Sequence, residues 1–261
     1  MTILNLFNFS LPQVQAAVLV FIRISAILFS APLFGSRNVP LQLKAGLAMI
    51  LTIIIFPVAG FKEVYFNSVI SLVPAMVGEI LIGVIIGFTA RLLFAAVQLG
   101  GQLVGFQMGF AIVNVLDPQT SAQVSIIAQL QNILTLLIFL AVNAHYWFIL
   151  ALASSFELIP PLGFCFTGSL MEAIVGLSCD MFLIAAKLAA PVIAVLFFTS
   201  VALGLIARTV PQMNIFIVGF PLKIAIGLFG VGFSLPLFSY MLKNLFQKMG
   251  EDIIVLMKLM T

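Results

Sequence analysis

The chain has 261 residues, of which 63% are hydrophobic and only 7% are charged, and its formal net charge is +3. Soluble domains contain about 45–50% apolar and about 25% charged residues, so this composition excludes an ordinary soluble fold. The few positive charges are scattered and form no basic patch of the kind that binds nucleic acid. Lipid or a large hydrophobic assembly must therefore cover much of the surface.

Six apolar regions are candidates for helices that cross a membrane, because a spanning helix needs about 20 predominantly apolar residues. None of these regions alternates with period two, so helices are expected and strands are not. The regions occupy residues 14–33, 41–59, 69–98, 124–151, 173–206 and 215–241. The sequence therefore predicts an all-α, membrane-type protein built from helical hairpins.

Charged residues and prolines interrupt these apolar regions. Each charge would cost about 2.5–3.5 kcal/mol at a bilayer centre, and each interior proline removes a helix hydrogen bond. We therefore expect kinked, broken helices that pack largely against other helices, with charges that pair or face the protein interior. The residues concerned are Arg23, Glu79, Arg91, Asp180, Lys187 and Lys223, and Pro32, Pro57, Pro74, Pro191, Pro221 and Pro236.

The C-terminal stretch 242–260 has the pattern of an amphipathic helix. Its apolar residues recur at three- and four-residue spacing, and charged residues occupy the remaining positions. Such a helix is expected at an interface or against a partner. The apolar face consists of Leu242, Leu245, Phe246, Met249, Ile253, Leu256 and Met260.

Glycines spaced by four residues occur twice. This small-xxx-small pattern allows one helix backbone to approach another closely, either inside the chain or between subunits. The glycines are Gly83 and Gly87, and Gly101, Gly105 and Gly109.

Residues 106–116 are interpreted as a connector that resembles a loop, because glycines and polar residues interrupt the apolar pattern there. A new helix is expected after it. Asp117 is the predicted N-cap of this helix and Pro118 its first residue, since a carboxylate can accept the free N–H groups of the first turn.

No enzyme, cofactor or metal site is expected. The sequence lacks the H-E-x-x-H, G-x-S-x-G and P-loop patterns. Its one histidine, His145, has no nearby Cys, Asp or Glu. The two cysteines, Cys165 and Cys179, lie in or near apolar stretches and are interpreted as packing residues.

Four stretches resemble the FliR family of flagellar type III secretion export-gate proteins, which has injectisome relatives. They are RISAILFSAPLFGSRNVPLQLKAGLA (23–48), GGQLVGFQMGFAIVNVLDPQ (100–119), FLAVNAHYW (139–147) and GLIARTVPQMNIFIVGFPLKIAIGL (204–228). The last is the most specific. Its motif residues are Arg208, Pro211, Gln212, Met213, Asn214, Pro221 and Lys223.

This resemblance implies a structural subunit of the pore through which unfolded flagellar proteins are exported. One copy would assemble with several copies of FliP and FliQ, with FlhB and FlhA as further partners. The location implied is the bacterial inner membrane, at the flagellar basal body. Residues 1–172 would be a FliP-like part that includes the connector, and residues 173–261 a FliQ-like hairpin with the amphipathic helix.

The resemblance also implies that the connector is a plug inside the closed pore, with glycines 105 and 109 as joints. The plug residues carried over are Phe106, Gln107, Met108, Phe110, Ile112, Val113 and Asn114.

A second interpretation is a secondary transporter for a small solute. Broken helices around Glu79, Arg91, Asp180 or Lys187 would then form its binding site near the middle of the membrane. Internal inverted repeats would favour this alternative, and the sequence shows none.

Overall fold

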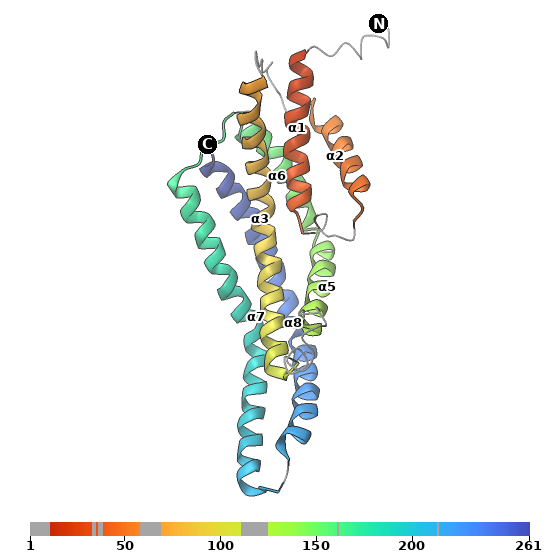
Figure 1. Ribbon diagram of the computed structural model, residues 1–261, viewed down its shortest axis with the longest axis vertical. Coiled ribbons are helices and arrows are strands. Elements are labelled where there is room, and N and C mark those ends of the chain that lie inside the picture. Colours follow the sequence, from red (N-terminus) through yellow and green to blue (C-terminus); the bar gives the residue numbers. More distant parts are fainter. Residues whose placement is uncertain are drawn as a thin grey trace. The chain divides into compact units, whose positions relative to one another are not determined.

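The protein is described here by a computed structural model that covers residues 11–32, 35, 39–57, 69–110, 125–160, 162–212 and 214–261. Every regular element in these ranges is a helix, so the predicted all-α fold is confirmed. The helices are α1 (Leu11–Ser30), α2 (Leu41–Ile55), α3 (Val69–Met108), α5 (Ile126–Ala141), α6 (His145–Leu158), α7 (Gly168–Thr209) and α8 (Ile215–Leu259) (Figure 1).

Four of these helices are long and apolar enough to cross a membrane, namely α1, α3, α7 and α8. Helices α5 and α6 are separated by three residues, and this bent pair has the length and composition of either a broken span or a re-entrant loop. Asn143 in this break has a φ of 54°, a conformation that asparagine tolerates better than most residues. The single apolar region predicted at 124–151 is therefore divided between two helices, because the chain turns at residues 142–144.

Helices α3 and α8 are longer than predicted. Their interior prolines, Pro74, Pro221 and Pro236, do not end either helix. The predicted amphipathic stretch 242–260 is accordingly the last part of α8 and not a separate helix. Six of its seven predicted apolar-face residues are buried, which confirms the face and shows that the chain itself covers it; they are Leu242, Phe246, Met249, Ile253, Leu256 and Met260.

The chain forms two compact units, each made from separate stretches of sequence. Unit 1 contains Met1–Arg91, Asn143–Leu177 and Gln247–Thr261, and unit 2 contains Leu92–Val142 and Ser178–Phe246. Helices α3, α7 and α8 each contribute to both units. The predicted division near residue 172, between a FliP-like and a FliQ-like part, is a different kind of division and stays a prediction.

In unit 1, α1 and α3 approach each other at two glycines. A Cβ atom built at Gly83 would lie 2.5 Å from Ala26 Cβ, and one at Gly87 would lie 1.8 Å from Ser30 Oγ. The Ser30 hydroxyl lies 3.0 Å from the carbonyl oxygen of Gly83. Only glycine permits this approach of α3 to α1, so the GVIIG stretch is an internal packing motif.

The C-terminal end of α8 is also held inside unit 1. The Cys165 N–H donates to the Met260 carbonyl at 2.7 Å, and the Thr167 hydroxyl donates to the Leu259 carbonyl at 2.9 Å. These bonds satisfy carbonyl groups that a helix end leaves without partners. The Gly250 backbone lies against the indole ring of Trp147, where a Cβ would come within 2.6 Å of the ring.

In unit 2, the second half of α3 packs against α5, α7 and α8. A Cβ at Gly101 would lie 2.5 Å from Ala128 Cα, and one at Gly105 would lie 2.1 Å from Ser125 Oγ. An apolar cluster fills the space between these helices. Its buried members are Val104, Met108, Ile127, Ala189, Val192, Leu196 and Val231.

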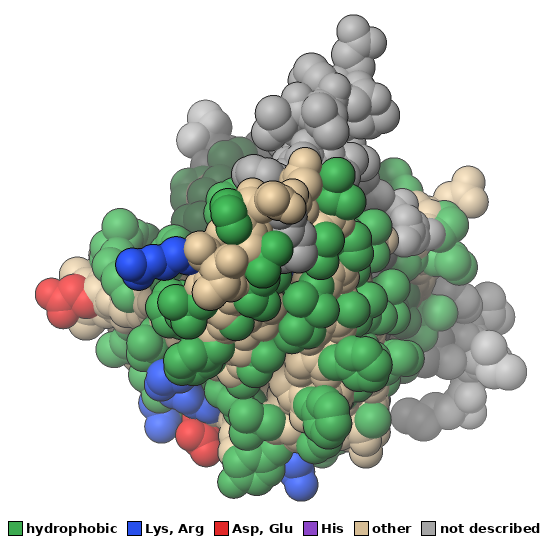
Figure 2. Space-filling view, turned by 90° about the horizontal axis from the view of Figure 1, so that it is seen from below, with side chains coloured by type: hydrophobic (Ala, Val, Ile, Leu, Met, Phe, Trp, Pro, Cys, Tyr) green, Lys and Arg blue, Asp and Glu red, His purple; other side chains and the backbone are tan. Residues whose placement is uncertain are grey.

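Much apolar surface remains uncovered by the chain. Within the spanning windows, 56% of α3 is buried, but only 28% of α7 and 17% of α8. Figure 2 shows one face of the molecule on which hydrophobic side chains predominate and charged side chains are few. Cys165 and Cys179, interpreted from the sequence as packing residues, are both exposed, so the chain itself does not bury them.

Replacing Gly87 by alanine tests the α1–α3 approach. The added methyl group would overlap Ser30, so we expect Gly87→Ala to reduce the free energy of unfolding by about 1–3 kcal/mol. Gly176→Ala in α7 is the matched control, because no atom lies within 4 Å of its Cβ position; it should leave stability unchanged or raise it by about 0.5–1 kcal/mol. Thermal unfolding of the purified chain in detergent would measure both, and equal melting temperatures would contradict the close approach.

Candidate functional site: the buried ion pair and the end of α3

Two of the charged residues buried in unit 1, Arg23 and Glu79, form an ion pair between α1 and α3. Both side chains are inaccessible, with Arg23 0% and Glu79 1% exposed. Arg23 Nε donates to Glu79 Oε2, and Arg23 Nη2 donates to Glu79 Oε1 at 3.0 Å. This two-pronged geometry matches the planar guanidinium to the carboxylate. The prediction that charges inside the spans pair is confirmed for these two residues.

The same arginine also binds α6 and the residue that follows it. Arg23 Nη1 donates to the Ser155 carbonyl at 2.6 Å, and Nη2 donates to the Ile159 carbonyl at 3.0 Å. The guanidinium carbon lies 4.5 Å from the centre of the Phe156 ring. One arginine therefore joins α1, α3 and the end of α6, and its buried donors are satisfied without water.

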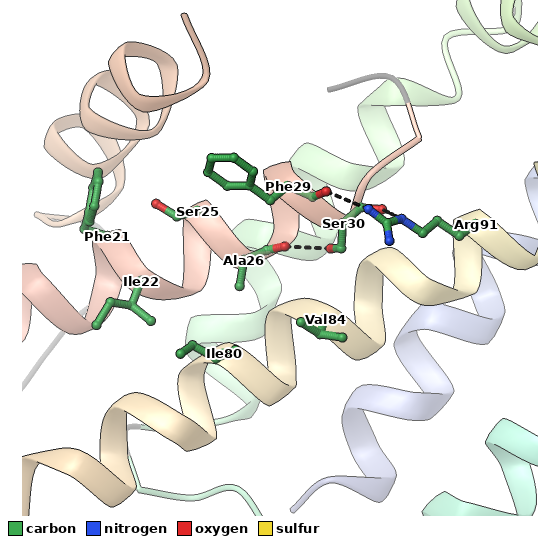
Figure 3. A pocket seen from close by; sticks show the side chains of 9 residues that line it. All are labelled: Phe21, Ile22, Ser25, Ala26, Phe29, Ser30, Ile80, Val84 and Arg91. Carbon is green, nitrogen blue, oxygen red and sulfur yellow. Dashed lines mark hydrogen bonds between the residues drawn. The ribbon is translucent and has the colours of Figure 1, made fainter. Parts of the chain in front are cut away.

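Arg91 has a different role, at the C-terminal end of α1. Its Nε donates to the Ser30 carbonyl at 2.7 Å and its Nη2 to the Phe29 carbonyl at 2.8 Å. A cation here is favourable because the last carbonyls of a helix carry partial negative charge. Figure 3 shows Arg91 reaching from α3 toward these carbonyls.

Beside Arg91 lies an open, mainly apolar groove of about 440 Å³ between α1 and α3. Besides Arg91, its polar lining consists of Ser25 and Ser30, so it has no acid and base pair for proton transfer. No group of three or more His, Cys, Asp or Glu residues that could hold a metal ion occurs in the described part of the chain. The remaining lining residues are Phe21, Ile22, Ala26, Phe29, Ile80 and Val84 (Figure 3).

The end of α3 is a defined helix cap. Gly109 has a φ of 95°, its N–H donates to the Phe106 carbonyl at 3.0 Å, and the Phe110 N–H donates to the Gly105 carbonyl at 3.1 Å. This is the pair of hydrogen bonds of a Schellman motif, with glycine at the left-handed position. Phe106, Gln107 and Met108 are thus helical, and the prediction that the loop begins at residue 106 is wrong.

The cap also changes the interpretation of the glycines as joints. Gly105 lies inside α3, against Ser125. Gly109 is held by the two cap hydrogen bonds, and a Cβ atom built on it would lie 2.9 Å from the Phe220 ring. Neither is a free joint.

The plug residues inside the described part of the chain have different environments. Phe106 is 70% exposed, whereas Met108 is fully buried in the apolar cluster of unit 2. Gln107 is half-buried, and Phe110 packs against the same cluster. The remaining predicted plug residues and the predicted cap, Ile112, Val113, Asn114, Asp117 and Pro118, lie outside the described residues.

The family-type motif lies around the turn between α7 and α8. Arg208 is in the last turn of α7, where its charge complements the helix end. The backbone carbonyl of Asn214 accepts from the Ile217 N–H at 3.1 Å and so begins α8. Pro211 and Gln212 lie in the turn, Pro221 and Lys223 lie inside α8, and Met213 lies outside the described residues.

Two residues that sequence reasoning missed contact the end of α3. Phe220 lies against Gly109, and the Gly227 backbone lies against Met108, whose Cγ is 2.7 Å from the position of a Cβ at Gly227. The only sequence signal was a glycine within an apolar helix, and such a signal does not identify the partner.

These features define a membrane-type helical protein in which Arg23, Glu79 and Arg91 hold helices together. The chain matches the family described as bacterial export proteins, family 1, over residues 14–249. It is 39% identical to the flagellar biosynthetic protein FliR of Bacillus subtilis (strain 168), over 88% of this chain and 90% of that protein. The FliR proteins of Escherichia coli (strain K12) and Aquifex aeolicus (strain VF5) are 34% and 30% identical, over 87% and 88% of this chain and 87% and 89% of those proteins.

The chain therefore belongs to the FliR family of bacterial export proteins. Its class is a subunit of the flagellar export apparatus and not a solute transporter, so the transporter interpretation is set aside. The geometry agrees with this, because Glu79 is held by Arg23 and Arg91 is held by the end of α1.

Removing one partner of the buried ion pair should be severe. Glu79→Ala leaves Arg23 as a buried charge without its carboxylate, and we expect the free energy of unfolding to fall by about 3–5 kcal/mol. Glu251→Ala, an exposed position in α8, is the control and should change it by less than about 0.5 kcal/mol. The double variant Arg23→Met/Glu79→Leu should be more stable than Glu79→Ala, since neither charge remains buried. Thermal unfolding in detergent measures all three, and a double variant less stable than Glu79→Ala would contradict the pairing.

Proposed function

We propose that this chain is a structural subunit of the flagellar type III protein export gate and forms part of the pore through which unfolded flagellar proteins leave the cytoplasm. The bacterial inner membrane, at the flagellar basal body, is the proposed location. Family membership supports the export role. The observation that carries the assembly is the small buried share of α7 and α8, 28% and 17% of their spanning windows.

The proposed partners are several copies each of FliP and FliQ around one copy of this chain, with FlhB and FlhA in contact with the gate. Residues 1–172 are proposed to take the place of a FliP-like subunit and residues 173–261 that of a FliQ-like hairpin. Uncovered apolar faces support partners made of similar helices, because close packing of helix against helix is what drives association in a membrane. Large exposed side chains on these helices include Phe197, Phe198, Leu205, Phe229, Phe233 and Tyr240.

The segment from residue 106 to 114 is proposed to block the closed pore. An apolar barrier excludes water and ions because apolar side chains offer them no hydrogen bonds. The exposed ring of Phe106 at the end of α3 supports this proposal for the described part of the segment. Met108 does not face the pore in this scheme, since it is buried in unit 2.

Native mass measurement tests the assembly. The chain, FliP and FliQ would be produced together and purified by a tag on this chain. We expect a single complex that contains one copy of this chain and several copies of each partner. A chain that purifies without FliP and FliQ when all three are produced together would contradict the proposal.

The barrier is tested by removing residues 112–114. Purified complexes in liposomes loaded with potassium chloride should release potassium ions faster with the deletion than without it, because the apolar obstruction is shorter. Asp180→Asn is the control. An export pore tolerates this loss of charge and stays closed, whereas a solute carrier that used Asp180 would lose uptake. A deletion complex that assembles and retains potassium ions would rule out the barrier.

A further inference from the structure

We propose that Gly227 and Phe220 of α8 are positioning residues that hold the end of α3 and so determine where the barrier segment begins. This inference rests on the proposed function for the role of that segment. The contacts themselves involve only described residues of unit 2.

The first contact is between Gly227 and Met108. Three side-chain atoms of Met108, Cγ, Sδ and Cε, lie 2.7 to 2.8 Å from the position that a Cβ at Gly227 would occupy. The methionine side chain therefore lies flat across the backbone of α8, and only glycine leaves room for it. Since Met108 is fully buried, the last helical residue of α3 is fixed by packing on α8.

The second contact is between Phe220 and Gly109. The ring atoms Cε2 and Cδ2 of Phe220 lie 2.9 and 3.1 Å from the Cβ position of Gly109. Phe220 is two turns before Gly227 in α8, so the two residues form one seat on the same helix. The seat holds both the end of α3 and the glycine that turns the chain away from it.

The hydrogen bonds of the cap add a directional constraint to the contacts of Gly227 and Phe220. The φ of 95° at Gly109 and the bonds from Gly109 and Phe110 to Phe106 and Gly105 define one direction for the chain after α3. Phe110 then packs against the same apolar cluster as Met108. A change in the seat therefore alters the direction of the chain where the barrier begins, even though the barrier itself is unchanged in sequence.

The test is a set of substitutions in the complete gate complex, reconstituted in liposomes loaded with potassium chloride. Gly227→Ala should increase potassium release relative to the unmodified complex, because the new methyl group displaces Met108. Gly230→Ala is the matched control on the same helix, since its Cβ would lie at an ordinary contact distance of 3.5 Å from Val192; it should leave the release unchanged. Native mass measurement on each complex shows whether assembly is intact.

A second substitution at Met108 shows whether Gly227→Ala acts through its contact with Met108 or through a general loss of packing. Met108→Ala removes all three atoms that meet the new methyl group, so the double variant Gly227→Ala/Met108→Ala should release less potassium than Gly227→Ala alone. A Gly227→Ala complex that assembles and releases no more potassium than the control overturns the proposal. If this variant does not assemble, Phe220→Ala decides, because it only removes atoms: faster release supports the seat, and unchanged release overturns it.

The deletion of residues 112–114 tests the barrier separately from the seat that Gly227 and Phe220 form. When the deletion complex leaks but the assembled seat variants do not, the barrier stands and the seat is refuted. When the deletion complex does not leak, the barrier itself is refuted.

Discussion

The ion pair between Arg23 and Glu79 is the interaction on which the packing of unit 1 depends. Two opposite charges without water are stable only when nearly every donor and acceptor is satisfied. Arg23 achieves this by binding Glu79 on α3 and the carbonyl groups of Ser155 and Ile159 around the end of α6. The arrangement permits one relative position of three chain segments, because any shift would leave a buried charge without its partners.

Glycines supply the second constraint, which is steric. The ion pair can form only if α1 and α3 lie close together, and Gly83 and Gly87 permit that approach. In unit 2, Gly101 and Gly105 permit a similar approach of α3 to the beginning of α5, and Gly227 receives Met108. A membrane-type protein gains little from hydrophobic burial between its helices, since lipid is equally apolar, so close packing and satisfied polar groups carry more of the stability.

These internal contacts leave the outer faces of α7 and α8 uncovered. The chain thus combines a well-packed interior with an apolar exterior that only lipid or other subunits can cover. Helix α8 shows both aspects, because only 17% of its spanning window is buried and it also holds the end of α3. Partners that bind α8 would therefore act on the same helix that positions the proposed barrier.

The sequence alone predicted the helical class, the apolar face of 242–260 and the pairing of charges inside the spans. These features follow from composition, periodicity and the cost of a charge in an apolar medium, which are properties of short stretches. The sequence did not predict where α3 ends: a local pattern of glycines and polar residues indicated a loop from Phe106, whereas the helix continues to Met108.

Only the tertiary structure decided the partners. Arg23 could have paired with any acidic residue in a span, and the fold selects Glu79, 56 residues away. Met108 and Phe106 have similar hydrophobic character in the sequence, yet one is fully buried and the other is 70% exposed. Sequence patterns report which residues avoid water. Which neighbour each one meets depends on how distant helices pack, and that is determined by contacts between residues far apart in the chain.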